Sequence, residues 1–263
     1  MAATDPRARL AELQEWAASQ GAVTQTHSYG PGPEHEADLL LPAGDGPHRV
    51  AVLLHGGFWR ARFKRSLMHA LAIDLAQRGW ATWNVEYRPG GSGGGAVETI
   101  DDVCAAIAAL GDLVARGQPL DLSRLLMIGH SAGGQLALCA ASASAVSSVV
   151  SLAGVCDLVS AFNDRIGDDA VAEFIGASPA QRPEAYAVAD PMHRLPTGAE
   201  VLLVHGDADD RVPVQLSRQY AVAARAAGDR SELLELARVD HFAIIDPRSR
   251  AWSEIAERLP SPT

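Results

Sequence analysis

The sequence has few features of a secreted, membrane or disulfide-stabilised protein. Its three cysteines, Cys104, Cys139 and Cys156, are widely spaced in apolar sequence, which predicts buried thiols rather than disulfides. No apolar run approaches the roughly 18 residues that a membrane-spanning helix needs, and the first residues lack the basic and apolar pattern of a signal peptide. We therefore expect a cytoplasmic protein.

Charge and motif content argue against nucleic-acid and membrane partners. The net charge is −10, from 32 acidic and 22 basic residues, which disfavours nucleic acid and anionic membranes. The sequence has no basic stripe, no Cys/His cluster with zinc-ligand spacing and no internal repeat. The expected partner is a small molecule, with no metal and no cofactor, and the chain is expected to be a monomer or a homodimer.

Strand-like and helix-like segments alternate along most of the chain, which predicts one α/β domain over residues 1–263 with a mostly parallel sheet. The leading helix is expected at about 6–20. Residues 157–195 interrupt the alternation with polar residues and prolines, so we interpret them as a small cap or lid. The glycine-rich stretch 89–95 is expected to be a flexible loop near a pocket mouth. The expected strands are 37–42, 50–54, 81–87, 124–128, 148–153, 201–204 and 232–239, and the later helices are 66–77, 97–116, 134–141, 214–227 and 247–259.

A G-x-S-x-G pattern occupies residues 129–133, between an apolar strand-like segment and a helix-like one. A tight strand-to-helix turn holds its serine in a strained conformation and exposes the hydroxyl at the end of the sheet. Side chains at Gly129 and Gly133 would collide with the neighbouring strand and helix. Ser131 is therefore the predicted nucleophile.

A serine hydroxyl needs a base to take its proton and a third group to orient that base. The segment after the strand at 201–204 supplies three acids, Asp207, Asp209 and Asp210, and the segment after the next strand supplies His241. The order Ser, acid, His matches a nucleophile-elbow enzyme. We assign His241 as general base and Asp209 as the orienting carboxylate, with Asp207 as its main rival.

Two rival carboxylates and the remaining histidines fit these roles less well. Asp210 is expected to lie in a solvated turn or to cap the following helix. Asp240 precedes His241 directly, and adjacent side chains rarely face each other in an extended segment. Histidines at strand ends, such as His205, are expected to hold loops by hydrogen bonds.

Stabilising the oxyanion that forms on a carbonyl requires preplaced N–H donors. The backbone N–H of Ala132 is one candidate, and those of Gly57 and Phe58, in the His55-Gly56-Gly57-Phe58-Trp59 segment, are the others. His55 and Trp59 are candidate pocket residues. The alternatives are that His55 fixes the loop and that Phe58 and Trp59 are core aromatics.

These motifs, together with His205-Gly206-Asp207-Ala208-Asp209-Asp210-Arg211-Val212-Pro213 and Asp240-His241-Phe242, resemble the α/β-hydrolase superfamily. The likeness covers about residues 37–259. Within this superfamily, the sequence is most similar to the esterase/lipase branch, which includes kynurenine formamidase-like and carbohydrate or feruloyl-esterase-like enzymes. The H-G-G-x-W form of the oxyanion loop resembles the formamidase-like group. The Tyr87-Arg88-Pro89 segment departs from the usual Tyr-Arg-Leu, and Gly134 after Gly133 is shared with many esterases.

The resemblance implies an α/β-hydrolase fold and a cofactor-free serine hydrolase that cleaves a small carboxylic ester or a formamide. The specific alternatives are an arylformamidase acting on N-formylkynurenine and a short-peptide aminopeptidase or amidase. An aminopeptidase needs an acidic anchor for the substrate amine, for which Asp168, Asp169 and Glu173 are candidates. A ligand-binding protein without activity is a further alternative, but all three triad residues are present.

Overall fold

The computed structural model describes residues 6–142, 144 and 146–262. Within this part of the chain, eight strands form one sheet in the order β1-β2-β4-β3-β5-β6-β7-β8. The pairs β1–β2 and β2–β4 are antiparallel, and every other neighbouring pair is parallel. The strands are β1 Gln25–Ser28, β2 Glu36–Leu40, β3 His48–Leu54, β4 Ala81–Val85, β5 Leu120–His130, β6 Val146–Leu152, β7 Glu200–Gly206 and β8 Arg230–Leu236.

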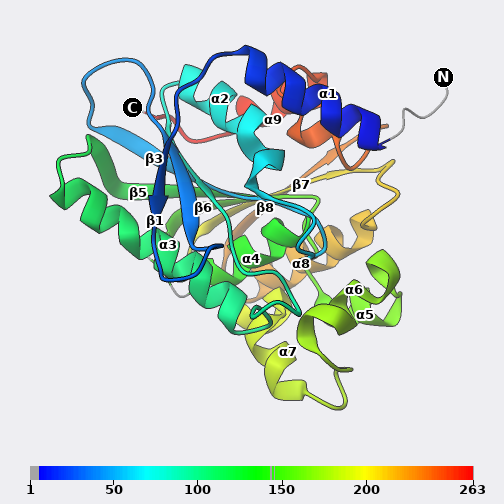
Figure 1. Cartoon of the computed structure of the whole chain (residues 1–263). Coiled ribbons are helices and arrows are strands. Elements are labelled where there is room, and N and C mark those ends of the chain that lie inside the picture. Colours follow the sequence, from blue (N-terminus) through cyan, green and yellow to red (C-terminus); the bar gives the residue numbers. More distant parts are fainter. Residues whose placement is uncertain (1–5, 143, 145, 263) are drawn as a thin grey trace.

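Helices cover both faces of the sheet, as Figure 1 shows. Helices α1, α2 and α9 lie on one face, and α3, α4 and α8 lie on the other. The helices are α1 Pro6–Ser19, α2 His69–Gln77, α3 Glu98–Ala115, α4 Ala132–Ala141, α5 Leu158–Asn163, α6 Ile166–Ile175, α7 Pro183–Ala189, α8 Val214–Ala226 and α9 Arg250–Ala256, with short 3₁₀ turns η1 Arg65–Met68, η2 Pro191–Arg194 and η3 Ala243–Ile245.

Alternate residues of the central strands serve the two faces, because successive side chains of a strand point to opposite sides. In β3, Val50, Val52 and Leu54 join the core beneath α3 and α4, whereas Ala51 and Leu53 join the core beneath α2 and α9. All five are fully buried. This two-sided burial explains the continuous apolar run at 50–54 and confirms the predicted α/β architecture.

Residues 157–195 fold into α5, α6, α7 and η2 at the carboxyl edge of the sheet. Ile166, Phe174 and Tyr186 of this segment are buried in the same apolar cluster as α3 and α4. Its backbone is unusual at the start of α6, where Arg165, Gly167, Asp168 and Asp169 have φ between 54° and 69°.

Two features of the structure, strand β1 and the packing of helix α1, have no clear signal in the sequence. Strand β1 is a short antiparallel edge strand, and its Gln-Thr-His-Ser sequence has no apolar alternation. Helix α1 packs its Leu13 and Ala17 against α2, and this contact brings its N-terminal half beside the loop after β8. No helix in the described part of the chain is long and apolar enough to span a membrane.

Candidate active site

Ser131 lies on a tight turn between β5 and α4, with φ 55° and ψ −117°. The neighbouring glycines are required, because a Cβ at Gly129 would lie 2.1 Å from the Gly133 carbonyl oxygen. A Cβ at Gly133 would lie 2.2 Å from the carbonyl oxygen of Leu54 in β3. The Ser131 N–H donates to the Leu152 carbonyl at 2.8 Å, which fixes the turn to β6. The G-x-S-x-G pattern thus has the predicted strand-to-helix geometry.

His241 and Asp209 meet above the ends of β7 and β8. Nδ1 of His241 donates to Oδ2 of Asp209 at 2.6 Å, and both side chains are buried. The Asp209 Oδ1 atom accepts the backbone N–H groups of Arg211 and Val212 at 2.8 and 2.9 Å. These bonds hold the carboxylate in place, and the Nε2 atom of His241 has no partner among the described residues.

A second histidine also contacts the Asp209 carboxylate. Nε2 of His205 lies 3.3 Å from Oδ2 of Asp209 and donates to the Val212 carbonyl at 2.9 Å. Because that carbonyl can only accept, the Nδ1 atom of His205 accepts from the Ser217 hydroxyl at 2.7 Å. The hydrogen bond to Val212 agrees with the loop-holding role expected of His205, whereas its contact with Asp209 has no signal in the sequence.

Burial alone would raise the pKa of Asp209, yet its pKa lies well below the ordinary carboxyl range. Hydrogen bonds from His205 and His241 and the backbone N–H of Val212 outweigh the burial. Asp209 is therefore an ionised, hydrogen-bonded carboxylate that faces His241.

The rival acids Asp207 and Asp240 lie in other environments. Asp207 accepts the backbone N–H of Arg238, which has a left-handed φ of 59°, and so stabilises the turn before His241. Asp240 is half exposed, and Nη1 of Arg9 in α1 donates to both of its carboxylate oxygens at 2.7 and 3.0 Å. Neither carboxylate contacts the His241 ring in the described structure.

His130, which precedes Ser131, is buried beside His241. Its Nε2 atom donates to the His241 carbonyl at 3.0 Å, and the two rings are 4.6 Å apart. Its Nδ1 atom is buried and has no hydrogen-bond partner among the described residues. Burial, with the adjacent His241, lowers the pKa of His130 to about 3, so its ring is neutral.

The loop after β3 has three consecutive residues with positive φ, Gly57 at 121° and Phe58 and Trp59 at 55°. The N–H groups of Gly57, Phe58 and Ala132 have no acceptor among the described residues. Trp59 anchors the loop, because its indole N–H donates to Oε1 of Gln135 in α4 at 2.9 Å. Its ring also stacks on Phe174 of α6 at 4.5 Å.

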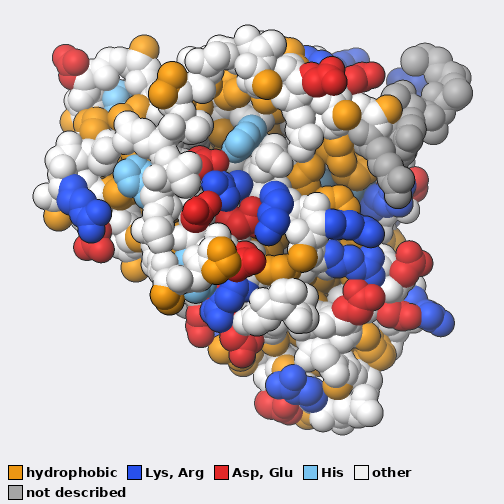
Figure 2. All heavy atoms as spheres, viewed as in Figure 1, with side chains coloured by type: hydrophobic (Ala, Val, Ile, Leu, Met, Phe, Trp, Pro, Cys, Tyr) orange, Lys and Arg blue, Asp and Glu red, His pale blue; other side chains and the backbone are white. Residues whose placement is uncertain are grey.

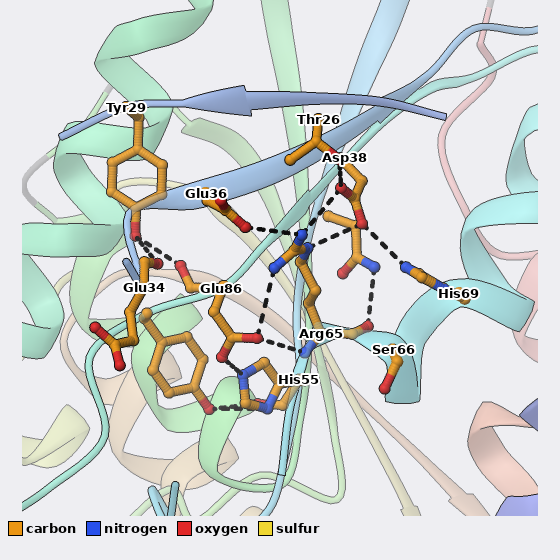
Figure 3. A network of polar contacts seen from close by, with 12 residues as sticks. Thr26, Tyr29, Glu34, Glu36, Asp38, His55, Arg65, Ser66, His69 and Glu86 are labelled. Atoms are coloured by element: carbon orange, nitrogen blue, oxygen red, sulfur yellow. Dashed lines mark hydrogen bonds and ion pairs between the residues drawn. The ribbon is translucent and has the colours of Figure 1, made fainter. Parts of the chain in front are cut away.

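Behind this loop lies a buried polar network (Figure 3). His55 donates from Nε2 to Oε1 of Glu86 at 3.0 Å and from Nδ1 to the Gly56 carbonyl at 2.7 Å. Oε2 of Glu86 accepts the backbone N–H of Arg65, whose guanidinium reaches Asp38 at 2.9 Å. Burial would raise the pKa of Glu86, but the hydrogen bond and charge of His55 and the Arg65 N–H hold it below its ordinary value.

Ser131 and His241 line one cavity of about 390 Å³. Gly57 and Phe58 line it too, but His55 and Trp59 do not. Their side chains are held in the interior by Glu86 and Gln135. Within the described chain, no hydrogen bond of 3.5 Å or less joins Ser131 Oγ to His241 Nε2. The structure thus brings together Ser131, His241, Asp209, Gly57, Phe58 and Ala132, and it places His55 and Trp59 behind them.

Two other regions considered from sequence lie away from this cavity. The glycine-rich loop is held by Arg88, which donates to the Gly93 carbonyl, and by the Gly90 N–H, which donates to the Trp59 carbonyl. It borders a separate hollow with α6. The proposed amine anchors are also outside the cavity: Glu173 pairs with Arg60 at 2.8 Å and Asp169 with Arg165 at 2.6 Å. An aminopeptidase reading therefore has no support from the cavity.

No group of three or more His, Cys, Asp or Glu side chains in the described residues is arranged to hold a metal ion.

The model of the family described as BD-FAE matches residues 37–223. An isoprenylcysteine alpha-carbonyl methylesterase of Arabidopsis thaliana is 27% identical over 248 residues, covering 81% of this chain and 55% of that protein. The chain thus spans about half the length of the curated relatives it matches.

Solved structures show the same fold. Esterase B of Lactobacillus rhamnosis superposes with a TM-score of 0.79 at 19% identity, covering 95% of this chain and 90% of that one. A bifunctional GH43-CE protein of Bacteroides eggerthii superposes with a TM-score of 0.71 at 25% identity, covering 82% of this chain and 35% of that one. The α/β-hydrolase fold expected from the sequence is therefore confirmed.

Proposed function

Because the chain belongs to the BD-FAE family, we propose that it is a serine esterase that cleaves small carboxylic esters. The observation that carries the proposal is the shared cavity of Ser131 and His241, with Asp209 fixed behind the histidine. The family match and the esterase names of the relatives support an ester as the substrate.

In the proposed reaction, Ser131 Oγ attacks the ester carbonyl carbon while Nε2 of His241 takes the hydroxyl proton. Asp209 holds His241 with Nε2 directed away from the carboxylate and stabilises the imidazolium. The imidazolium then protonates the leaving alcohol, and the acyl-enzyme forms. Water, deprotonated by His241, attacks the acyl carbon and releases the acid. The Ser131–His241 contact is expected to tighten when substrate binds.

Negative charge develops on the carbonyl oxygen during both attacks. We assign its stabilisation to the N–H groups of Gly57, Phe58 and Ala132, which have no competing acceptor in the described structure. The Trp59–Gln135 hydrogen bond ties this loop to the helix that begins beside Ser131. The donors and the nucleophile are thereby held in fixed relation.

The proposed role of residues 157–195 is that of a cap within a single domain. Phe58 supports this assignment, because a Cβ at Gly167 of α6 would lie 2.5 Å from the Phe58 ring. Arg60 adds to it by donating to the carbonyls of Gly167 and Asp168 at 2.9 and 3.2 Å. The segment thus packs directly on the oxyanion loop.

Hydrolysis of p-nitrophenyl acetate by wild type and Ser131→Ala tests the proposal. The variant is expected to lose at least about a thousandfold in kcat/KM while its circular dichroism is unchanged. A fluorophosphonate probe should label wild type and the surface control Ser142→Ala equally, and Ser131→Ala not at all. Activity that survives in Ser131→Ala would reject the mechanism, and a protein that neither turns over nor labels would be a binding protein.

N-formylkynurenine, assayed in parallel, separates the two substrate classes that the sequence left open. Ser131-dependent preference for this formamide would make the protein an arylformamidase. Turnover of the ester alone, which the family match favours, would leave it a carboxylesterase.

A further inference from the structure

The cavity that holds Ser131 and His241 combines an apolar wall with positive charge. Two arginines, Arg62 and Arg211, line it, and none of its lining residues is Asp or Glu. This contrasts with the chain as a whole, in which 32 acidic residues outnumber 22 basic ones. The apolar part of the wall is formed by Leu10, Phe58, Phe63, Leu67, Phe242 and Ile245.

Arg62 has no carboxylate within 4 Å in the described residues. Its guanidinium instead lies 4.9 Å from the ring centroid of Phe63, another wall residue. The guanidinium of the nearby Arg60, by contrast, donates hydrogen bonds to Glu173 and to two backbone carbonyls of α6. Arg60 therefore binds the cap, whereas the guanidinium donors of Arg62 are available beside the cavity.

Arg211 is only weakly neutralised. The sole carboxylate contact of its guanidinium in the described structure is with Asp210 at 3.3 Å, and the Asp210 side chain is 74% exposed. Exposed pairs of this kind are strongly screened by water. Figure 2 shows Lys and Arg side chains gathered on the face below helix α1, next to an apolar stretch.

From this arrangement, and resting on the proposed esterase function, we infer that the site selects esters that carry a carboxylate in their acyl chain. The guanidinium groups of Arg62 and Arg211 bind the carboxylate, since arginine pairs with planar anions through charged hydrogen bonds. The aromatic and aliphatic wall takes the methylene chain. Local positive charge at the cavity offsets the repulsion between an anionic substrate and a protein of net charge −10.

The test compares p-nitrophenyl hexanoate with p-nitrophenyl monoadipate, whose six-carbon acyl chains differ only in a terminal methyl or carboxylate. Wild type is expected to favour the adipate by about tenfold in kcat/KM at low salt, and the preference should shrink as ionic strength rises. Arg62→Gln and Arg211→Gln should each reduce the adipate-to-hexanoate ratio several-fold, and the double variant should abolish the preference.

Lys64→Gln is the matched control, because Lys64 is an exposed cation in the same loop that does not line the cavity. It should keep the wild-type ratio. Ser131-dependent hydrolysis of hexanoate with no adipate preference, or a preference retained by the double arginine variant, would overturn this inference and leave the proposed function intact. Equal turnover by wild type and Ser131→Ala would instead overturn the proposed function.

Discussion

His241 and His55 are both held by buried carboxylates at the carboxyl edge of the sheet, but their second ring nitrogens differ. His241 donates from Nδ1 to Asp209, and its Nε2 has no partner among the described residues. His55 uses both nitrogens, one for Glu86 and the other for the Gly56 carbonyl. A histidine can relay a proton to substrate only through a nitrogen that is not already engaged, so of these two histidines His241 is the one that we propose as the catalytic base.

The two carboxylates differ in the same way. Asp209 is balanced by two histidines and two backbone N–H groups, with no arginine or lysine ion pair in the described structure. Glu86 is joined to Arg65, which also reaches Asp38 and Glu36, as Figure 3 shows. The first arrangement is suited to a change in the charge of its histidine during turnover, and the second to a permanent structural link between the oxyanion loop and the sheet.

Replacing Asp209 should give the largest effect. Asp209→Asn is expected to lower kcat at least about a thousandfold, because it removes the charge that orients His241 and stabilises its imidazolium. Asp207→Asn is the control, since its carboxylate contacts the Arg238 backbone instead. Steady-state kinetics on an ester checks both, and equal losses in the two variants would remove Asp209 from its assigned role.

Replacing Glu86 should act on folding more than on turnover. Glu86→Gln is expected to lower the free energy of unfolding by roughly 3 kcal/mol, because it leaves buried donors without their charged partner. The folded Glu86→Gln protein should retain a kcat within about tenfold of the wild-type value. Glu36→Gln, which touches the same Arg65 from a 43% exposed side chain, should cost under about 1 kcal/mol. Urea unfolding measures both, and a thousandfold activity loss at wild-type stability would instead make Glu86 catalytic.

The smallest expected effect concerns the free energy of unfolding at acid pH, and it depends on His130, the residue before Ser131. Its pKa is lowered from 6.5 to about 3 by burial and by His241. Between these values the unfolded chain binds a proton that the folded protein does not, so stability falls with falling pH by up to about 1.4 kcal/mol per pH unit. His130→Gln should lessen this slope between pH 6.5 and 4.5 and leave the slope between pH 7.5 and 8.5 unchanged. Unfolding curves at these pH values test it, and an unchanged acid slope would contradict it.

The parallel sheet and the positions of Ser131, Asp209 and His241 were accessible from sequence because strand ends carry local signals. Apolar runs mark buried strands, and strand ends share one edge of a parallel sheet. Strand β1 carries no such signal, since its four residues have no apolar alternation. The roles of the three residues remain predictions.

The placement of His55 and Trp59 was not accessible, because it depends on partners distant in sequence. Glu86 is 31 residues from His55, and Gln135 is 76 residues from Trp59. The same applies to His205, whose contact with Asp209 depends on how the loop after β7 folds back. Motif spacing locates such residues at the edge of the sheet but cannot say whether they face the cavity or the interior.

Helix α1 lies before the region that matches the BD-FAE family. Its Leu10 nevertheless forms part of the cavity wall, and its Arg9 forms an ion pair with Asp240 beside His241. One lining residue of the cavity is therefore encoded apart from the strands and loops that carry Ser131, Asp209 and His241. Substitution of Leu10 would therefore reshape this part of the cavity while Ser131, Asp209 and His241 stay unaltered.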